Sequence, residues 1–383
     1  MSWPSKLFRW LNDARAARAQ CGRPMSAQAL ELMRLVLGPA RLGPGDYYSY
    51  RLFEPDLTLE QKQRFVGWRR EPLLDALNDP SWHVLGLDKV VMTALLAEQG
   101  LHCTQTRAIF LPGHERHLQH ARCLHDEAEL QAWLRDPANY PFFGKPVASG
   151  FGRGALWALG YRGASDEVLL RDGRVLPVAR FSSQWCDPEH LGYLLQQPLE
   201  ADPRLLAALG PTPTSLRMMV LVDEVEGPLL HRAFWKLPVG RNMNDNFNDG
   251  RDGNLAAGID LTSGRIVRVV NGSGLRLREC SLHPDTGVEL RSVSVPDWPN
   301  VQAFTLGAAD LFPRLRFQQW DIALTAQGPC AIEVNLFGTG GCELSQVLNR
   351  QGLLDDAMAR FLARQAARRA GGTGTQLGAS TLR

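Results

Sequence analysis

The chain has 383 residues, and its 42 Lys and Arg nearly balance its 40 Asp and Glu, which leaves a formal net charge of +2 at pH 7. This balance argues against a nucleic-acid or membrane-surface protein, because such proteins carry strongly basic surfaces. Hydrophobic residues at 44% and charged residues at 21% are typical of a globular chain. The length favours two or three lobes.

Cysteine spacing and the N-terminus predict a cytoplasmic protein. The seven cysteines are odd in number and form no CxxC pair, so neither a disulfide framework nor a zinc site is expected. The first 20 residues carry charges throughout and lack the apolar segment of a secretory signal. No run of about 18 apolar residues occurs, so we expect no membrane span.

Helices are expected at the start of the chain. In residues 6–19 and 26–37, apolar side chains recur at i, i+3, i+4 and i+7. Ser26 is the expected N-cap of the second helix, and Gly38-Pro39 is expected to end it. We expect the first helix to dock on the protein body; the alternative is a basic amphipathic helix on a membrane.

Further helices carry capping signals. Thr58 is an expected N-cap with Gln61 as its capping-box partner. Another helix is expected to begin near Asp88 and to end at Gly100, the residue type that favours the left-handed position after a helix. Two more helices are predicted at residues 126–136 and 344–365.

Strands dominate the rest of the chain. Residues 102–111 predict one strand, and 140–161 predict two strands around a glycine-rich turn. The later hairpin-like stretches are 167–178, 216–240, 256–270 and 315–338. Leading helices followed by antiparallel hairpins predict an α+β fold rather than a doubly wound sheet.

The last hairpin places two carboxylates opposite each other. A three-residue loop closed by Gly328 pairs residue 325 with 329 and 323 with 331, and it sets Asp321 opposite Glu333. Asn335 shares their face, whereas Ile332 is expected on the core face. Like charges at opposed positions are destabilising, and a magnesium ion with oxygen ligands would compensate them. The alternative is an ordinary solvated sheet face.

Three basic residues and a glycine-rich turn fit phosphate binding. Lys145 ends a short strand and precedes glycines at alternate positions, whose N–H groups can point at a phosphate. Lys89 stands at a helix N-terminus, where acids are preferred. Arg217 lies in an apolar strand, and buried arginines are rare unless they are paired or functional. For each residue a structural or solvated role is the alternative.

In order, these motifs resemble the ATP-grasp superfamily, and most closely its sugar-transfer-associated branch, over roughly residues 45–345. The similar stretches include LDKVVMTALLAEQGL, FFGKPVASGFGRGALWAL, TSLRMMVLV, FWKLPVGRNMNDNFNDG, HPDTG, PDW and WDIALTAQGPCAIEVNLFG. HPDTG contains His283 and PDW contains Asp297, and we assign no role to either residue. The chain departs from many relatives at Gln197, where an acidic residue is common, and at Phe337, where many ligases have an arginine.

The resemblance implies two α+β lobes with antiparallel sheets that grip ATP, and an N-terminal helical extension. The implied divisions are a helical region at 1–80, an N-lobe with the glycine-rich loop at 81–195, a C-lobe with the metal-binding hairpin at 196–368, and a disordered tail at 369–383.

The resemblance also implies the site residues. ATP would be bound by Lys89, Lys145, Ser149, Gly150, Gly152, Gly154, Gln196, Gln197, Leu199 and Asp245. Mg²⁺, for which Mn²⁺ can substitute, would be held by Asp321, Glu333 and Asn335. The catalytic set would be Arg217, Arg241 and Asn246.

The implied activity is ADP-forming ligation of a small carboxylate to an amine through an acyl phosphate, in the biosynthesis of an amino acid, peptide or sugar derivative. A kinase acting on a hydroxyl group and a non-catalytic nucleotide-binding protein are the alternatives. A histidine metal site at His114, His117, His120 and His125 is disfavoured, because HERH lacks the HExxH spacing.

Overall fold

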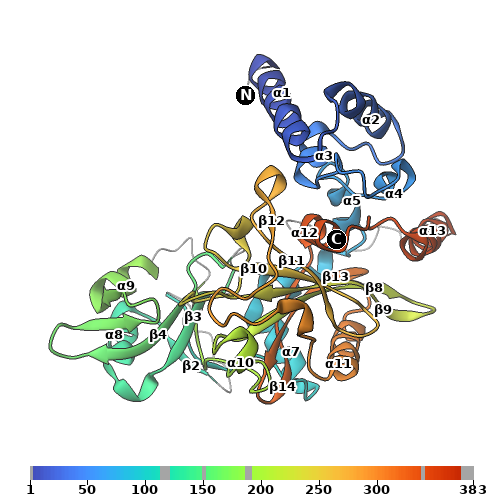
Figure 1. Ribbon diagram of the computed structural model, residues 1–383. Coiled ribbons are helices and arrows are strands. Elements are labelled where there is room, and N and C mark those ends of the chain that lie inside the picture. The colour runs from blue at the N-terminus through green and yellow to red at the C-terminus, as the bar shows by residue number, and fades with distance from the viewer. Residues whose placement is uncertain (1–2, 113–120, 149–151, 186–191, 338–340, 372–383) are drawn as a thin grey trace.

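The computed structural model describes residues 3–112, 121–148, 152–185, 192–337 and 341–371 (Figure 1). The helices are α1 Trp3–Cys21, α2 Met25–Leu37, α3 Pro44–Ser49, α4 Leu59–Gln63, α5 Glu71–Asp75, α6 Val84–Leu87, α7 Lys89–Glu98, α8 Glu127–Arg135, α9 Val178–Trp185, α10 Leu206–Leu209, α11 Trp298–Asp310, α12 Gly341–Asn349 and α13 Asp356–Gly371. The strands are β1 Thr106–Phe110, β2 Arg122–Leu124, β3 Phe142–Pro146, β4 Leu156–Arg162, β5 Glu167–Leu170, β6 Val175–Pro177, β7 Tyr193–Gln196, β8 Thr214–Asp223, β9 Gly227–Leu237, β10 Leu255–Ile259, β11 Ile266–Asn271, β12 Arg278–Glu279, β13 Phe317–Thr325 and β14 Gly328–Asn335.

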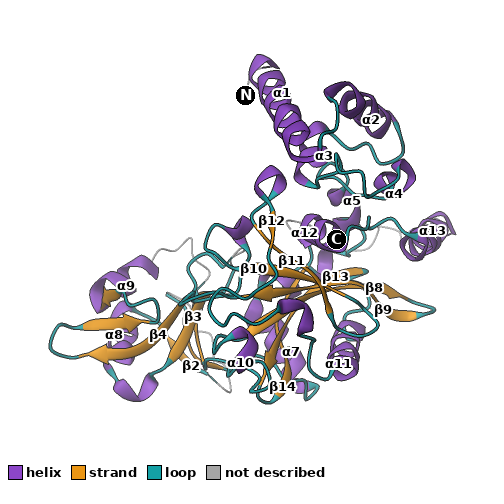
Figure 2. Ribbon diagram, viewed as in Figure 1, coloured by secondary structure: helices purple, strands orange, loops and turns teal. Residues whose placement is uncertain are grey.

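The strands form two sheets of seven strands each (Figure 2). The first has the order β2-β1-β7-β3-β4-β5-β6, and all its pairings are antiparallel except that of β1 with β2. The second has the order β12-β11-β10-β9-β8-β13-β14 and is antiparallel throughout. The α+β prediction, with two antiparallel sheets and leading helices, is therefore confirmed.

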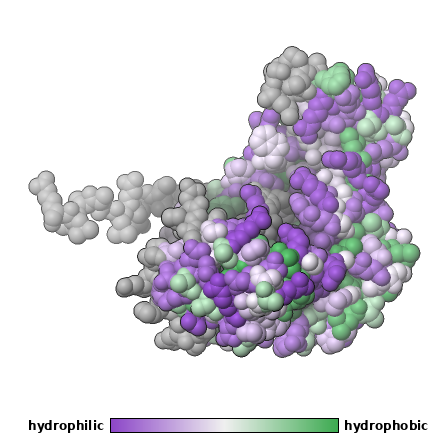
Figure 3. All heavy atoms as spheres, turned by 90° about the vertical axis from the view of Figure 1, so that its left-hand side faces the viewer, coloured by the Kyte–Doolittle hydropathy of each residue, from purple (hydrophilic) through white to green (hydrophobic). Residues whose placement is uncertain are grey.

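Each sheet builds its own core. Helices α8 and α9 cover one face of the first sheet around Phe142 and Phe181, which are fully buried. Helix α11 packs on the second sheet, where Phe312 stacks on the buried Trp320. The outer surface of the first lobe, seen in Figure 3, mixes hydrophilic and hydrophobic side chains.

The N-terminal helices share a core with the other face of the second sheet. Phe53 and Phe65 pack in one apolar cluster with Phe317 and Met358. Polar contacts fix the same junction: Gln346 of α12 bonds both the N–H and the C=O of Val66, at 2.8 and 3.0 Å. The expectation that the first helix docks on the body is met, and no described helix is long and apolar enough to cross a membrane.

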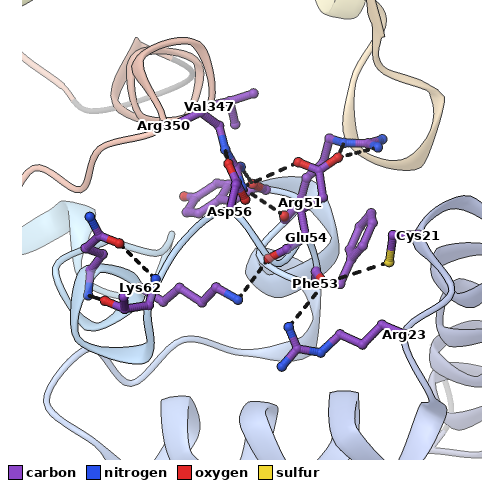
Figure 4. Close-up of polar contacts among 12 residues, drawn as sticks. Cys21, Arg23, Arg51, Phe53, Glu54, Asp56, Lys62, Val347 and Arg350 are labelled. Carbon is purple, nitrogen blue, oxygen red and sulfur yellow. Dashed lines mark hydrogen bonds and ion pairs between the residues drawn. The ribbon is translucent and has the colours of Figure 1, made fainter.

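A buried ion-pair network holds the N-terminal region together (Figure 4). The Lys62 ammonium has no exposed surface and lies 3.0 Å from Glu31 and 3.1 Å from the Glu54 carbonyl. Arg350, which follows α12, binds Asp56 at 2.6 Å and the Tyr50 carbonyl at 2.9 Å. Helix α12 is thereby tied to the N-terminal helices.

Most of the predicted helix ends are confirmed. Thr58 and Gln61 form the expected capping box, and the Asp88 side chain accepts bonds from the first turn of α7. Gly100 has a φ of 68°, as expected of the residue after a helix. The prediction for Ser26 was wrong, because α2 begins at Met25 and its N-cap is Pro24, which fixes an extended φ but offers no side-chain acceptor.

Candidate functional site

A row of charged side chains crosses one face of the second sheet. In the register of the strands, Arg217 of β8 lies opposite Asp321 of β13, and Asp321 lies opposite Glu333 of β14. The predicted carboxylate pair is therefore confirmed. Arg217 was not expected beside it, because the pairing of β8 with β13 joins residues about a hundred positions apart in the chain.

Asp321 is neutralised by the protein itself. The Arg217 guanidinium donates to both Asp321 oxygens, at 2.5 and 3.1 Å, and the Lys236 ammonium lies 3.3 Å away. Burial raises the pKa of Asp321, but the attraction of Arg217 and Lys236 outweighs it and holds that pKa below its usual range. The sequence argument, in which a magnesium ion would compensate the opposed carboxylates, did not foresee that Arg217 and Lys236 balance Asp321 within the protein.

Lys236 of β9 joins two carboxylates. Its ammonium lies 3.5 Å from Asp245 and 3.3 Å from Asp321. Burial alone would lower the pKa of Lys236, but the two carboxylates raise it above its usual value. Asp245 is held further by the Ser215 hydroxyl, which donates to it. The loop after β9 is in this way fixed to the face of the sheet.

The predicted register of the last hairpin is correct from Gln319–Asn335 to Asp321–Glu333 and shifted by one residue between there and the loop. Thr325 pairs with Gly328 and Ala323 with Cys330, so the loop has two residues rather than three. A bulge between Asp321 and Ile322 restores the expected pairing of Asp321 with Glu333. The prediction that Ile332 faces the core was wrong, because the bulge turns this residue into a cavity.

Two lysines reach this face from the first lobe and α7. The Lys89 ammonium lies 3.5 Å from Glu333 and 3.4 Å from the Val147 carbonyl. Lys145 is 7% exposed, and burial, together with Lys89, lowers its pKa to about 8 although Glu333 acts in the opposite sense. Two cations with little exposed surface, side by side in one cleft, provide a site for an anion of several negative charges.

A first cavity, of about 140 Å³, lies between the two lobes. Its lining includes the apolar Phe143, Trp157, Met243 and Ile332 and the charged Lys89, Lys145, Lys236, Asp321 and Glu333. The linker after β7 also borders it through Gln196, Gln197, Pro198 and Leu199. A ligand with a flat apolar group and an anionic group would fit this lining.

The glycine-rich turn and the Asn-rich loop touch at the mouth of this cavity. Gly152 has a φ of 66°, and a Cβ on it would lie 2.2 Å from the Asn246 amide nitrogen, so another residue there would be strained and would displace the Asn246 side chain. Asn254, which is 1% exposed, donates to the carbonyls of Asn244 and Asn246 at 3.0 and 2.8 Å. Asn254 thereby holds the Asn-rich loop in its conformation.

A second cavity, of about 260 Å³, continues from the first. The two share Gly152, Lys236, Asn246 and Glu333. The second is lined in addition by Arg217, Asn335, Ser49, Phe234, Phe247, Asn248, Asp249, Gly272, Ser273, Gly274, Leu277, Gly341, Glu343, Leu344 and Val347. Ser49 belongs to α3, so the N-terminal helices form part of its wall.

The structure brings most of the residues expected at the site together. Lining one or both cavities are Lys89, Lys145, Gly152, Gln196, Gln197, Leu199, Asp245, Asn246, Arg217, Asp321, Glu333 and Asn335. The Gln196 amide donates to Thr104 and Thr106, and the Gln197 N–H donates to the Gln105 carbonyl. Beyond Gln197, Pro198 and Leu199 border the cavity, whereas the Glu200 carbonyl accepts from the Ala326 N–H.

Other expected residues lie elsewhere. Arg241 and Gly154 line neither cavity; Arg241 is exposed near Arg171, and the Gly154 carbonyl accepts a bond from Tyr193. Ser149 and Gly150 lie outside the described residues, as do His114, His117 and His120 of the disfavoured metal site and residues 372–383 of the expected tail. The described residues contain no group of three or more His, Cys, Asp or Glu placed to hold a metal ion.

His283, to which the sequence assigned no role, supports a loop together with its neighbour Asp285. The buried His283 ring lies 3.3 Å from the Pro238 carbonyl, and the Asp285 carboxylate accepts from the Gly240 N–H at 2.6 Å. Both contacts brace the segment that leads from β9 into the Asn-rich loop. Asp297 adopts a left-handed φ of 50° at the start of α11.

Sequence reasoning missed Lys236, Asn254 and Glu343. Lys236 had the same signal as Arg217, a basic residue inside an apolar strand, FWKL, which should have marked it. Asn254 and Glu343 had no comparable local signal, since their positions follow from long-range packing.

Comparison with known proteins agrees with this arrangement. The model of the sugar-transfer-associated ATP-grasp family matches residues 69–360. The chain belongs to this family. A comparison with curated protein sequences gave no match.

Solved structures with the ATP-grasp fold are similar at low identity. They include D-alanyl-alanine synthetase A from Vibrio cholerae (10% identity, TM-score 0.40, 76% of this chain and 67% of that chain). Phosphoribosylamine–glycine ligase from Thermotoga maritima has 13% identity and a TM-score of 0.41, with 78% of this chain and 61% of that chain covered. L-amino acid ligase from Bacillus licheniformis has 12% identity and a TM-score of 0.36, with 84% and 56% covered. The family assignment rests on the sequence match alone.

Proposed function

We propose that this ATP-grasp protein is an ADP-forming carboxylate–amine ligase that acts through an acyl phosphate on a small biosynthetic metabolite. The observation that carries the proposal is the junction of the two cavities at Lys236 and Glu333. A nucleotide in the first cavity would place its last phosphate at this junction, next to a second cavity with room for the groups to be joined.

In this proposal the first cavity binds ATP. Adenine would lie between Trp157, Met243 and Ile332, next to the linker at Leu199. Lys89 and Lys145 would bind the phosphates, and the glycine-rich turn at Gly152 would cover them. Because both lysines are already buried in the cleft, little reorganisation is needed when the nucleotide binds.

Mg²⁺, or Mn²⁺ in its place, would be held at the junction by Glu333 and Asn335 together with Asp321, which would share its oxygen atoms between the ion and Arg217 and Lys236. Asp321, Glu333 and Asn335 offer two carboxylates and an amide on adjacent strands, and hard oxygen ligands with phosphates completing the shell suit magnesium. The Asn335 amide lies 3.5 Å from Glu333, so these two side chains already approach each other. When bound, the ion would neutralise charge on the phosphates.

The proposed reaction has two steps. The substrate carboxylate attacks the γ-phosphorus, the bond to the β-phosphate oxygen breaks, and ADP leaves. The amine then attacks the acyl carbon, a C–N bond forms, and inorganic phosphate leaves with the loss of a proton from nitrogen. Arg217 lines the second cavity beside the junction, where its charge would stabilise the transferring phosphoryl group, and Asn246 would orient it.

Trapping with hydroxylamine tests this proposal. Purified protein, ATP and Mg²⁺ would be incubated with hydroxylamine and a panel of amino acids and sugar acids, and hydroxamate and ADP would be measured. At least one carboxylate should give both products in equal amounts. A hydroxyl compound that gives ADP and its own phosphate ester without a carboxylate would establish a kinase instead. Nucleotide binding with no product across both panels would favour a non-catalytic nucleotide-binding protein.

A further inference from the structure

Helix α2 has polar side chains on its inner face and apolar side chains on its outer face. Its buried positions are Gln28, Glu31 and Leu35. The Gln28 amide donates to the Ala14 carbonyl at 3.1 Å, and the Glu31 carboxylate lies 3.0 Å from the Lys62 ammonium. A surface helix normally has the reverse arrangement, with its apolar stripe against the core. The exposed large apolar side chains of α2 are Leu30, Met33, Val36 and Leu37.

A neighbouring segment extends this apolar surface. Arg70 donates to the carbonyl of Pro39, just after α2 ends, so residues 68–73 lie beside the C-terminal end of the helix. Trp68 is 62% exposed, and Leu37 at the end of α2 is 80% exposed. Figure 1 shows α2 on the side of the molecule away from both sheets. We call these exposed apolar side chains the outer N-terminal surface: Leu30, Met33, Val36, Leu37, Trp68 and Leu73.

Positive charge accompanies the outer N-terminal surface. The Arg69 guanidinium lies 5.4 Å from the centre of the Trp68 ring, and Arg34 of α2 and Arg41 are exposed. Residues 1–43 contain seven Lys and Arg but only two Asp and Glu, whereas the rest of the chain contains 35 and 38. Each of these two acids is already paired with described basic side chains, Asp13 with Arg9 and Glu31 with Arg23 and Lys62. The nearly neutral total of the whole chain, which argued against a membrane surface, conceals this local excess.

We propose that the outer N-terminal surface docks on a bilayer that contains anionic phospholipids. Its apolar side chains would enter the boundary between headgroups and acyl chains, where tryptophan is favoured, and the arginines would bind lipid phosphates. A second copy of this chain fits this surface less well, because it would bring the same arginines together. Nucleic acid offers phosphates but no apolar layer for Leu37. The proposal goes beyond the ligase reaction and does not depend on it.

Sedimentation with vesicles tests the proposal. The full chain would be mixed with vesicles of phosphatidylcholine alone or of phosphatidylcholine and phosphatidylglycerol in equal amounts. The partition coefficient should be about tenfold higher on the anionic vesicles and should fall at high salt, which screens charges. Leu37→Glu and Trp68→Glu, on separate segments, should each lower it by about tenfold, because each removes an apolar contact and adds a repelled charge. Arg34→Gln should lower it by about fivefold.

Val225→Glu is the matched control. Val225 is 76% exposed in the turn between β8 and β9, outside the outer N-terminal surface, so this variant should bind vesicles as the wild type does. Equal binding to both kinds of vesicle, or binding that survives both Leu37→Glu and Trp68→Glu, would overturn the proposal. A wild-type dimer that Leu37→Glu dissociates, measured by sedimentation velocity without lipid, would also overturn it, because a second copy would then cover this surface.

Discussion

The two cavities meet at Glu333 but differ in how their charges are balanced. In the first, Asp321 is bonded to Arg217 and Lys236, Asp245 to Lys236 and Ser215, and Glu333 lies beside Lys89. In the second, Glu343 is half-buried, and partial burial together with Asp249 and Asp46 raises its pKa. Paired charges fix a geometry before a ligand arrives, whereas an unpaired charge stores free energy that a ligand of opposite sign can release.

The difference predicts opposite responses to the removal of a charge. Breaking a buried pair strands its partner in a medium of low polarity, so the fold becomes less stable. Removing a charge that is already unbalanced relieves repulsion, so the fold becomes more stable. The predictions that follow test this contrast.

Arg217→Met should have the largest effect. It leaves Asp321 with Lys236 as its remaining cation, and we expect the free energy of unfolding to fall by about 3–5 kcal/mol. Chemical denaturation at pH 7 measures this change. Arg204→Met is the matched control, because Arg204 binds Asp202 at 2.6 Å but is 58% exposed, and about 0–1 kcal/mol is expected. Equal losses in the two variants would contradict the contrast.

Lys145→Met should separate ligand binding from stability. Loss of a charge-assisted phosphate contact is expected to weaken ADP binding by about tenfold to hundredfold. The folded-state pKa of about 8 lies below the ordinary 10.5, so burying the charged lysine lowers stability fully below pH 8, and this loss disappears as pH rises to 10.5. The variant should therefore be at least as stable as wild type at pH 7.

Calorimetric ADP titration and thermal unfolding measure these two effects on the same samples. The gain in stability should shrink between pH 8 and pH 10.5. Unchanged ADP affinity would remove Lys145 from the phosphate site, and a large loss of stability at pH 7 would show that its charge is balanced in the fold.

Local patterns in the sequence predicted most strands, most helix ends and the face on which Asp321 and Glu333 lie. They missed β2 and β7, and the single helix expected at residues 344–365 is divided into α12 and α13. The predicted pair was right although the register near Gly328 was not, because a shorter loop and a bulge offset each other. The alternation of apolar and polar residues along a strand indicates which face of the sheet each side chain occupies. It does not show the extra residue that a β-bulge inserts. Ile332 was assigned to the wrong face for that reason.

Such local patterns do not show the order of the strands within a sheet. Arg217 acquires Asp321 as its partner only because β8 lies between β9 and β13. The same pairing supplies cations that the sequence of the hairpin does not show: the hairpin contains two acids, while Arg217 and Lys236 come from β8 and β9. The acidic wall at Glu343 likewise needs α12, the loop at Asp249 and the N-terminal helices to meet.

Glu71→Gln should stabilise the protein in a pH-dependent way. Burial, Glu343, Asp75 and Asp46 raise the pKa of Glu71 to about 7 from 4.5, so the folded state binds a proton more tightly and stability falls as pH rises through this window. The variant should match wild type near pH 4.5 and exceed its Tm by about 2 °C at pH 8.

Thermal unfolding followed by circular dichroism at both pH values checks this expectation. The exposed Glu289 provides the control, since Glu289→Gln should leave Tm unchanged at each pH. A lower Tm for Glu71→Gln at pH 8 would mean that the Glu71 carboxylate is balanced by a cation after all.

Phe337→Arg should have the smallest effect on activity. Many ATP-grasp ligases have an arginine at this position, yet the Phe337 ring lines neither cavity and packs edge-on against His83, with ring centres 5.0 Å apart. We expect ADP formation to change by less than about twofold and the free energy of unfolding to fall by about 1 kcal/mol, the value of one aromatic contact. An increase of tenfold or more in ADP formation, or tighter binding of a carboxylate, would show that a side chain at 337 reaches the second cavity. The positive charge near the junction would then come from this position as well as from Arg217, and the contrast between a balanced and an unbalanced cavity would depend on one substitution.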